Sequence, residues 1–428
     1  MGGGASKDLM TSSSLKAEPP TVMIPGNHRD EETHPMEVHL RNIHNANPDI
    51  KIHTVVSVDM DYDHDKAMTI PLGEVSDEQL LAEVARRNLD LHDKITDTLV
   101  KETYNLGEAI GFGASGEVLL ATHKTNNTKF ACKIVKKNSS MNDAQSMSTE
   151  IEIMKRIRHR NVVSMYELYE TPKCLWIILE LVDAGDLLSH LATIDEHSEK
   201  LAARFIKQVF HGLHYLHSLG IVHRDIKLDN ILLNHEGMIK LADFGLSALV
   251  RLGESGYDPD ESKKRKSYSE LHEMWGTREY FAPEIINQAY GPQADVWAVG
   301  CILFEILCGR HAFPHEPGEE NQSHYARIKK GLLDFSKPGW SKVSNGAKEL
   351  VKMLLTIDPT ERLSASEALL HPWIKLSHFH AHGGASIDDE KDPHSNLPLV
   401  EAHQILKMRF NERIKKKKKI IHARDPVM

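Results

Sequence analysis

The order of hydrophobic and polar residues divides the middle of the chain into a strand-rich stretch followed by a helix-rich stretch. Short apolar runs separated by turn residues, such as 117–121 and 130–134, predict strands in the first part of residues 104–374. Beyond Ser198 the apolar residues recur at helical spacing, as they do at Ala202, Phe205, Ile206, Val209 and Phe210. The pattern predicts an α+β fold in which a small β-rich lobe precedes a larger α-helical lobe, with a cleft between them.

The segments outside this globular stretch have a different texture. Residues 1–75 are rich in His, Asp, Ser and Pro without a sustained apolar period, which predicts a largely disordered region. Ser76 and Gln79 form a capping box that opens a predicted helical extension over 76–103. After the globular domain, a polar, His-rich linker over 375–398 leads to a basic amphipathic tail over 399–428.

Composition narrows the class of protein. The 428 residues carry a formal charge of -9, which argues against a nucleic-acid partner because such proteins usually have a basic balance. No apolar stretch reaches the roughly 18 residues that span a bilayer. The four cysteines lie in apolar segments without a CxxC pair, which indicates buried, reduced thiols rather than disulfides. We therefore expect a cytoplasmic protein.

A glycine-rich turn provides the first chemical signal. Residues 111–118 read Gly-Phe-Gly-Ala-Ser-Gly-Glu-Val, a GxGxxGxV pattern whose glycines allow the backbone to lie close over phosphates. The same glycines occur in dinucleotide-binding turns, but there a helix follows the third glycine. Here the residues after Gly116 have a strand-like pattern, so a phosphate-covering hairpin is favoured.

A lysine within the next apolar strand provides the second signal. Lys133 lies among Ala131, Cys132 and Ile134, and a buried ammonium is costly unless it is paired. Glu150, on a helix predicted from about Ala144 to Arg158, is its expected partner. The alternative is a lysine that extends its ammonium from a strand edge to solvent.

The strongest signal is the sequence His-Arg-Asp-Ile-Lys-Leu-Asp-Asn at 223–230, followed by Asp-Phe-Gly at 243–245. These residues resemble the catalytic loop and metal-binding motif of the eukaryotic protein kinases. The closing His-Pro-Trp at 371–373 is most similar to the calcium/calmodulin-dependent kinase group. The resemblance implies a bilobal kinase fold with an antiparallel N-terminal sheet, and ATP and Mg²⁺ as the nucleotide and the metal.

The resemblance assigns a role to each residue of these motifs. Asp225 would accept the proton of the substrate hydroxyl, and Lys227, at the position typical of serine/threonine kinases, would neutralise the phosphoryl group. Asn230 and Asp243 would bind Mg²⁺, and Lys133 with Glu150 would complete the catalytic set. The nucleotide would contact Ile110, Gly111, Phe112, Gly113, Ala114, Ser115, Gly116, Val118, Ala131, Lys133, Glu180, Val182, Asp186 and Leu232.

The segment from Asp243 to Glu284 is expected to be regulatory. Glu273 stands where many kinases carry a phosphothreonine, so its carboxylate could pair with Arg224 and order the segment without phosphorylation. The catalytic subunit of phosphorylase kinase is similar in this respect. The Gly-Thr pair ending at Thr277 indicates a polypeptide acceptor. Ser267 and Ser269, in a lysine-rich insert, are candidate phosphorylation sites, and a simple solvated insert is the alternative.

Two structural pairs are also expected from the resemblance. Glu284 should pair with Arg362, and Asp295 should bond the backbone of the catalytic loop. Asp186 and Asp229 suggest a basic residue upstream of the phosphoacceptor, because acidic groups there would attract it.

The two ends carry weaker signals. Gly2 begins an N-myristoylation pattern, and one acyl chain needs a second signal for stable membrane binding. The tail supplies nine Lys or Arg against three Asp or Glu over 401–428, with Lys415 to Lys419 unbroken. An apolar stripe at Ala402, Leu406, Phe410 and Ile414 lies ahead of this lysine run. This tail could bind calmodulin, or it could bind an acidic membrane surface and make the protein a peripheral membrane protein. It could also act as a nuclear signal or as an autoinhibitory helix, or remain a solvated tail.

Two other functions remain as alternatives. A pseudokinase scaffold would keep the fold without the chemistry, and the presence of Lys133, Glu150, Asp225, Asn230 and Asp243 argues against it. A small-molecule kinase of related fold is disfavoured by the long activation segment. The sequence predicts an ATP-dependent serine/threonine kinase acting on protein substrates.

Overall fold

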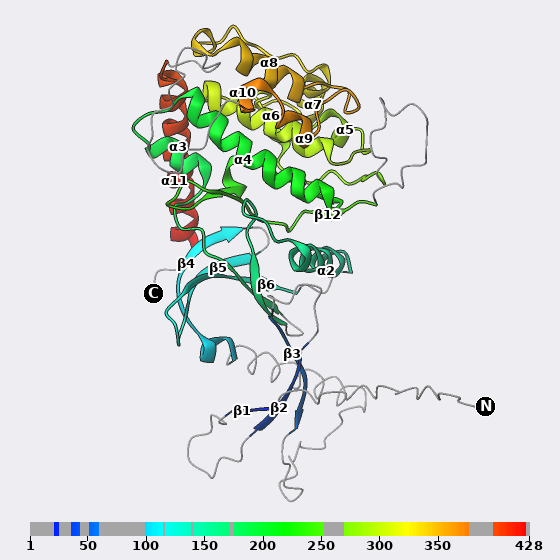
Figure 1. Cartoon of the computed structure of the whole chain (residues 1–428), viewed down its shortest axis with the longest axis vertical. Coiled ribbons are helices and arrows are strands. Elements are labelled where there is room, and N and C mark those ends of the chain that lie inside the picture. The colour runs from blue at the N-terminus through cyan, green and yellow to red at the C-terminus, as the bar shows by residue number, and fades with distance from the viewer. Residues whose placement is uncertain are drawn as a thin grey trace, which may run out of the picture. The chain divides into compact units, whose positions relative to one another are not determined.

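The computed structural model describes residues 21–24, 36–42, 51–59, 99–113, 116–137, 141–170, 174–251, 269–375 and 397–424 (Figure 1). The chain forms two compact units. The first contains Met1–Thr128, Cys132–Lys137 and Tyr166–Ile178, and the second contains Lys129–Ala131, Asn138–Met165 and Leu179–Met428. One unit is built on a sheet and the other mainly on helices, which confirms the predicted α+β class.

Five strands form the sheet that the sequence predicted. They are β4 (Tyr104–Gly113), β5 (Gly116–His123), β6 (Lys129–Lys136), β7 (Met165–Glu170) and β8 (Cys174–Glu180), in the order β7-β8-β6-β5-β4. β4 and β5 pair antiparallel, with Gly111 opposite Val118. The glycine-rich turn therefore joins two strands, as predicted, and not a strand to a helix.

Three additional strands extend this sheet beyond β7. They are β1 (Thr21–Ile24), β2 (Met36–Asn42) and β3 (Lys51–Asp59), and β3 pairs parallel with β7. Here the structure differs from the prediction of little order in residues 1–75. The sequence of β3 contains Ile, Thr and three Val in nine residues, and this β-branched content favours a strand locally despite the polar composition around it.

The second unit is mainly helical. Its helices are α2 (Met141–Arg156), α3 (Leu187–Thr193), α4 (Glu199–Ser218), α5 (Pro283–Ile286), α6 (Gln293–Cys308), α7 (Asn321–Lys330), α8 (Asn345–Leu354), α9 (Ala365–Ala368), α10 (Pro372–Lys375) and α11 (Val400–Arg424). Its short strands are β9 (Ile221–Val222), β10 (Ile231–Leu233), β11 (Ile239–Leu241) and β12 (Ala248–Leu249). The described residues of this unit also form the 3₁₀ turns η1 (Leu228–Asn230), η3 (Arg278–Tyr280) and η4 (Trp340–Lys342).

The core of this unit lies around α4 and α6. The side chain of Ser198 caps α4 by accepting the N–H of Leu201, which satisfies one of the unpaired donors at a helix start. All residues of α6 from Ala294 to Cys308 are buried, including Trp297. A helix that is buried on every side is a core helix, and α4, α8 and α11 all pack against α6.

Both predicted structural pairs are confirmed. Arg362, which is fully buried, forms a two-pronged ion pair with Glu284 and lies over the ring of Trp297. Asp295, at the start of α6, accepts the N–H groups of His223 and Arg224 at 2.9 Å each. The core helix thereby fixes the backbone at the start of the catalytic loop.

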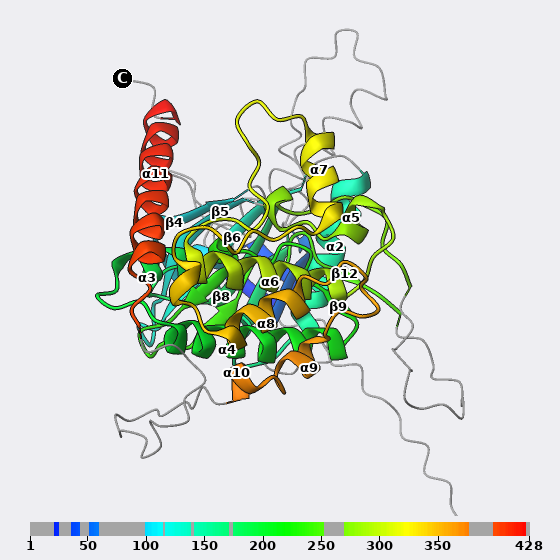
Figure 2. The same ribbon diagram turned by 90° about the horizontal axis from the view of Figure 1, so that it is seen from above.

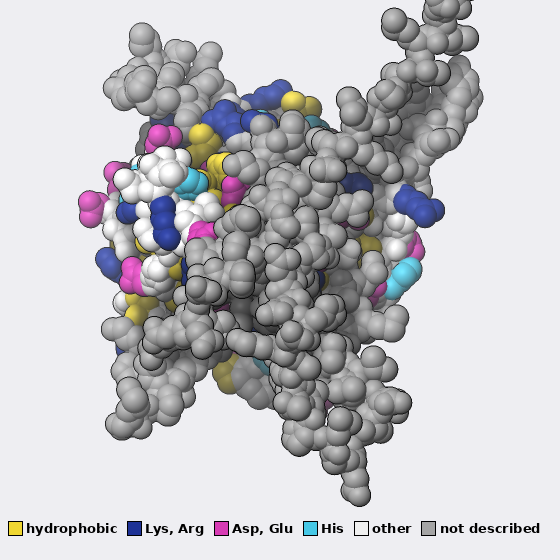
Figure 3. Space-filling view, turned by 90° about the horizontal axis from the view of Figure 1, so that it is seen from below, with side chains coloured by type: hydrophobic (Ala, Val, Ile, Leu, Met, Phe, Trp, Pro, Cys, Tyr) yellow, Lys and Arg dark blue, Asp and Glu magenta, His cyan; other side chains and the backbone are white. Residues whose placement is uncertain are grey.

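The four cysteines, all of which the structure describes, form no disulfide with one another. Cys132, Cys301 and Cys308 are buried and Cys174 is half-buried, and burial raises the pKa of the Cys132 and Cys308 thiols to about 12. Within the part of the chain that the structure describes, no helix combines the length and the apolar content that crossing a bilayer requires. The described side chains visible in Figure 3 include both acidic and basic groups.

The C-terminal helix α11 packs along the catalytic lobe. It contacts α3 and α6, and Figure 2 shows it beside α3. The helical extension predicted over 76–103 is described only at residues 99–103, which are helical. Gly2, Ala114, Ser115, Ser267 and the linker at 376–396 lie outside the described residues.

Candidate active site

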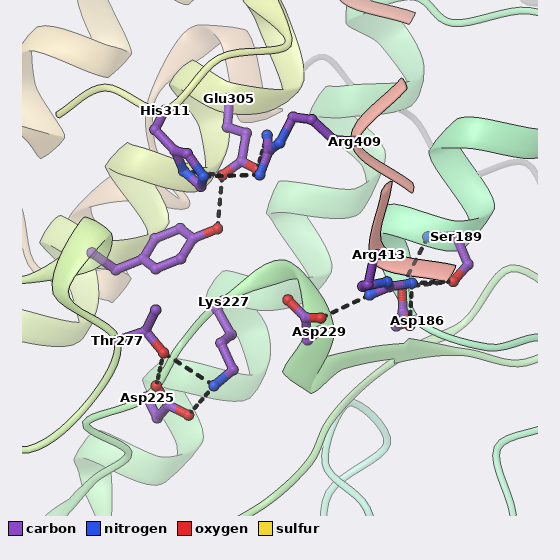
Figure 4. Close-up of polar contacts among 11 residues, drawn as sticks. Asp186, Ser189, Asp225, Lys227, Asp229, Thr277, Glu305, His311, Arg409 and Arg413 are labelled. Carbon is purple, nitrogen blue, oxygen red and sulfur yellow. Dashed lines mark hydrogen bonds and ion pairs between the residues drawn. The ribbon is translucent and has the colours of Figure 1, made fainter. Parts of the chain in front are cut away.

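Asp225 is the centre of a hydrogen-bond network in the catalytic loop (Figure 4). Its Oδ2 accepts from Lys227 Nζ at 2.6 Å, and its Oδ1 accepts from Thr277 Oγ1 at 2.8 Å. Oδ2 also accepts from Asn230 Nδ2 at 3.0 Å. Lys227 Nζ also donates to Thr277 Oγ1 at 3.1 Å. The structure thus brings together four residues that the sequence predicted, and it ties the catalytic loop to the end of the activation segment.

The backbone next to Asp243 is bonded to the same loop. The N–H of Ala242 donates to the carbonyl of Asn230 at 2.9 Å, and the carbonyl of Ala242 lies 3.1 Å from Nε2 of His223. Asp243 follows with a φ of 66°, a left-handed conformation that is uncommon outside glycine and typical of functional sites. The two predicted metal ligands, Asn230 and Asp243, therefore belong to adjacent, mutually bonded segments.

Arg224 joins the catalytic loop to the activation segment. Its guanidinium donates to the carbonyls of Leu246 and Ser247, and its Nη1 lies 3.4 Å from Oε2 of Glu273. The Arg224 side chain is 11% exposed and that of Glu273 is 61% exposed. The predicted contact is present, and its length and exposure are those of a moderate interaction.

Gly276 allows the activation segment to approach this loop. Its φ is +115°, and a Cβ added there would lie 2.4 Å from the carbonyl oxygen of Arg224. Any other residue would push the segment away from the catalytic loop. This glycine thereby positions its neighbour Thr277 against Asp225.

In the first unit, the position of Gly116 also requires glycine, because of its positive φ and the closeness of neighbouring backbone. Its φ is +137°, and an added Cβ would lie 2.1 Å from the carbonyl oxygen of Ile134 on β6. The hairpin of β4 and β5 is thus held close to the strand that carries Lys133. Lys133 and Glu150 are 8% and 5% exposed, and their mutual pairing stays a prediction.

The predicted adenine-binding residues of the second unit lie around the end of β8 and on β10. Glu180 uses its N–H to bond the carbonyl of Ser164 at 2.9 Å and its carboxylate to pair with Lys240 at 2.6 Å. The backbone carbonyl of Glu180 is therefore the candidate group for a hydrogen bond to the edge of the adenine base. Ala131 is buried, and Val182 and Leu232 are half-buried.

Asp186 and Asp229 have a partner that the sequence did not reveal. Arg413, on α11, donates through Nη2 to both oxygens of Asp186 at 2.9 Å and through Nη1 to Oδ1 of Asp229 at 2.7 Å (Figure 4). Nη2 also donates to Ser189 Oγ at 2.7 Å. Asp186 additionally caps α3, by accepting the N–H of Ser189.

A second acidic site was also missed. Glu305 is fully buried on α6 and forms an ion pair with Arg409 of α11. Its other oxygen accepts from Tyr280 OH at 2.8 Å and lies 3.4 Å from Nδ1 of His311. Burial alone would raise the pKa of Glu305, but His311, Arg409 and Tyr280 outweigh it and lower the pKa to about 2. In the sequence, this site is indicated by Glu305 itself, a carboxylate inside the apolar run that forms α6.

Of the two candidate phosphorylation sites, only Ser269 is described. Its Oγ accepts the N–H of Arg251 at 2.9 Å, and its N–H donates to the carbonyl of Arg251 at 3.1 Å. Ser269 therefore closes the base of the insert. Among the described residues, no group of three or more His, Cys, Asp or Glu side chains is arranged to hold a metal ion.

The comparisons with known proteins agree with this geometry. A family model described as "Protein kinase domain" matches residues 104–374. The chain therefore belongs to the protein kinase family, whose members bind ATP and transfer its phosphate.

Among curated proteins, the chain is 34% identical over 282 residues to a rice protein named "Calcium-dependent protein kinase 2". It is 32% identical over 323 residues to an Arabidopsis thaliana protein named "Calcium-dependent protein kinase 12". These alignments cover 64% and 74% of this chain and 51% and 60% of the relatives, so the chain spans about half the length of the curated relatives it matches. This similarity indicates that the chain is a serine/threonine kinase of the calcium/calmodulin-dependent group.

Proposed function

We propose that this protein is an ATP-dependent kinase that phosphorylates serine or threonine hydroxyls of polypeptides. The observation that supports it most is the network in which Asp225 contacts Lys227, Asn230 and Thr277. A carboxylate so oriented can take the proton of an attacking hydroxyl, and a lysine within 2.6 Å of it can offset charge on the transferred group.

The reaction is a displacement at phosphorus. The substrate oxygen forms a bond to the γ-phosphorus of ATP while the bond to the bridging oxygen of ADP breaks, and the hydroxyl proton passes to Asp225. Asn230 and Asp243 would hold Mg²⁺, since hard oxygen ligands suit it and the amide nitrogen of Asn230 is committed to Asp225. When bound, the metal supplies positive charge to the phosphates.

The pseudokinase alternative is less well supported. Such a scaffold has no need for Lys227 and Thr277 to converge on Asp225, or for Asp295 to fix the backbone of the loop that carries it. These contacts all serve the position of one carboxylate. They are the arrangement expected of a working catalytic loop.

The contact between Arg224 and Glu273 supports activity without phosphorylation of the activation segment. Glu273 supplies a negative charge at the place where the sequence expects a phosphate acceptor, and its carbonyl accepts from Tyr290 OH at 2.7 Å. The carboxylate thus links the activation segment to Arg224 in the protein as synthesised.

The further partners proposed for this kinase are those that the tail and Gly2 predict. Calmodulin or an acidic membrane surface would bind the basic segment, and a myristoylated Gly2 would add a second membrane contact. The relatives are named calcium-dependent protein kinases. For this chain we propose regulation by calcium only through the binding of calmodulin to the basic segment.

A transfer assay tests the proposed function. The full, unphosphorylated chain and its Asp225→Asn variant are given ³²P-labelled ATP, Mg²⁺ and two basic peptides that differ only in a Ser or a Tyr acceptor. We expect label on the serine peptide from the wild type and a loss of roughly 10²- to 10⁴-fold in the variant. Equal label from both proteins, or label only on tyrosine, would refute the proposal.

A further inference from the structure

Basic side chains gather on one face of α4 and on the loop that leads from α2 to β7. Lys207, His211 and His214 follow one another along α4 at spacings of four and three residues, which places them on one side of the helix. His159 and Arg160 belong to the loop. His211, His214 and Arg160 are exposed, and Lys207 and His159 are half-buried. We call these five residues the α4 basic cluster.

The loop is held close against α4. A Cβ added at Gly212 of α4 would lie 3.0 Å from the carbonyl oxygen of Asn161, so a larger residue there would push the loop away from the helix. The side-chain amide of Asn161 donates to the carbonyl of Ile239 at 3.0 Å and to Oε1 of Gln208 at 3.3 Å. These contacts fix the backbone that carries His159 and Arg160 next to the basic face of the helix.

The ring of His159 is fixed both in position and in tautomer. It stacks on Tyr215 of α4, with ring centroids 4.8 Å apart and 15° between the ring planes. The hydroxyl of Tyr215 accepts the N–H of Arg158 at 2.7 Å, which holds the loop on the other side of the ring. Nδ1 of His159 accepts the N–H of Asn161 at 3.1 Å. The proton of the neutral ring is therefore on Nε2, and this nitrogen is a hydrogen-bond donor.

Arg160 has no acidic partner among the residues that the structure describes. Its Nη2 lies 3.7 Å from the thioether sulfur of Met238, which is only a weak acceptor. In contrast, Arg156 of α2 pairs with Glu152, one turn earlier on the same helix. A guanidinium without a carboxylate partner keeps its planar set of donors for an oxyanion.

The charges of the cluster act on one another. The pKa values of His159 and His211 are lowered first by burial and then by basic neighbours: Arg160, Lys207, Lys240 and His214. The imidazoles of His159 and His211 are therefore mostly neutral at pH 7 and serve as uncharged donors. The permanent charges of the cluster are the two cations Arg160 and Lys207, and a bound anion would relieve their mutual repulsion.

We infer that the α4 basic cluster is a docking site for a phosphorylated serine or threonine of a polypeptide. Such a side chain carries a charge of about −1.5 to −2 at pH 7 and three strong acceptor oxygens. Two cations with imidazole donors beside them match one phosphate group, whereas a membrane surface presents many anionic headgroups at once. The inference does not depend on the proposed function, but the proposed reaction produces side chains of this kind.

The test measures binding while the active site is filled. The full chain is given Mg²⁺ and a non-hydrolysable ATP analogue, and the probe is a fluorescein-labelled Gly/Ala peptide with one phosphoserine and no basic residue. Its anisotropy should show binding to the wild type, and binding roughly tenfold weaker to Arg160→Ala. Arg160→Lys keeps the charge and loses the planar fork, so its affinity should fall between the two. Arg156→Ala removes a charge that is already paired, and its affinity should stay within about twofold of wild type.

Three further probes identify the source of the anion. The phosphoserine peptide should bind roughly tenfold more tightly than the same peptide with Glu in place of phosphoserine. Inorganic phosphate should compete with it, because it presents the same oxygens. Vesicles of equal parts phosphatidylcholine and phosphatidylserine should bind Arg160→Ala and wild type equally. If Arg160→Ala and Arg156→Ala bind the phosphoserine peptide equally, if the Glu peptide binds as tightly, or if only the vesicles distinguish the variants, the inference is overturned.

Kinase activity is measured separately, with a serine peptide with two arginines upstream of the acceptor as the substrate. Arg160 contacts Met238 and not the network around Asp225, so Arg160→Ala and Arg156→Ala should both keep kcat within about twofold of wild type. If none of the proteins transfers phosphate, the proposed function fails, and the anisotropy still decides whether the α4 basic cluster binds phosphoserine.

Discussion

The catalytic loop and the surface under α11 are both built from carboxylates held by basic and hydroxyl groups, but they differ in how the chain assembles them. In the catalytic loop, Lys227 and Asn230 reach Asp225 from two and five positions away. Under α11, Arg413 reaches Asp186 from 227 positions away.

That difference determines what a single sequence can reveal. Short-range contacts require particular residues at fixed spacing, so they leave a motif that can be recognised. Long-range contacts leave only single residues that do not fit their surroundings, such as Glu305 inside the apolar α6 and Arg409 on the buried stripe of α11. The partners become visible only when the fold is known.

The largest effect should come from the catalytic loop. Lys227→Ala removes a cation 2.6 Å from Asp225 and the donor to Thr277, so we expect kcat to fall by roughly 10²-fold with a small change in KM for ATP. Steady-state kinetics measure this, with Lys330→Ala, an exposed lysine on α7, as the control. A kcat within about threefold of wild type would show that Lys227 does not act in transfer.

The contact under α11 should respond in stability rather than in rate. Glu305→Gln removes the charge that pairs with Arg409, and losing a charged, buried contact costs about 2 to 3 kcal/mol. The amide hydrogens of 400–416 should then exchange about 30- to 150-fold faster than in wild type.

The matched control for this exchange experiment is Glu412→Gln, which changes an exposed carboxylate on α11 itself. Equal protection of α11 in both variants would show that the pair between Glu305 and Arg409 does not hold the helix.

Acid should weaken the start of α11. His197 lies with Nε2 2.7 Å from the carbonyl of Ile306, and its own carbonyl accepts the N–H of Leu399 at 2.8 Å. Burial lowers the pKa of His197 from 6.5 to about 4. Its neutral form is therefore favoured by folding, so its contribution is complete above pH 6.5 and is lost as the pH falls towards 4.

Between pH 7 and pH 5 this loss amounts to about 2 kcal/mol. Hydrogen exchange at 397–406, corrected for the intrinsic effect of pH, should show it, and His197→Gln should remove most of the pH dependence. The same acid sensitivity in the variant would assign the effect to other groups.

A smaller effect is expected at Glu273. Because its contact with Arg224 is 3.4 Å long and its side chain is 61% exposed, Glu273→Ala should lower the activity of the unphosphorylated enzyme by about fivefold. Glu270→Ala, an exposed carboxylate three residues earlier, serves as the control. If the two variants keep equal activity, Glu273 does not order the activation segment.

Much of the catalytic lobe followed from the sequence. The start of α4 after Ser198, the pair between Glu284 and Arg362, and the bonds from Asp295 to the catalytic-loop backbone are all confirmed. These features depend on local capping or on motif positions. The helix predicted from about Ala144 to Arg158 is present as α2, displaced by two or three residues.

Other parts could not be predicted from local pattern. The predicted apolar stripe of the tail is buried at Ala402 and Leu406, whereas Phe410 and Ile414 are only half-buried. Their neighbours Arg409 and Arg413 make the contacts instead, because the lobe presents carboxylates there. The strands β1 to β3 are hard to predict because the polar composition around them obscures their own β-branched residues.

The assignment of Asp225 as the catalytic base is tested most directly by comparing it with Asp229, a second carboxylate four residues further along the chain. Phosphorylation of the serine peptide with two arginines is followed by rapid quench in a single turnover at saturating ATP, with Asp225→Asn and Asp229→Asn compared with wild type. We predict that Asp225→Asn slows the chemical step by roughly 10²- to 10⁴-fold at unchanged peptide affinity, whereas Asp229→Asn leaves that step within about threefold and changes the affinity. A chemical step that survives in Asp225→Asn would contradict the assignment of this protein's catalytic base.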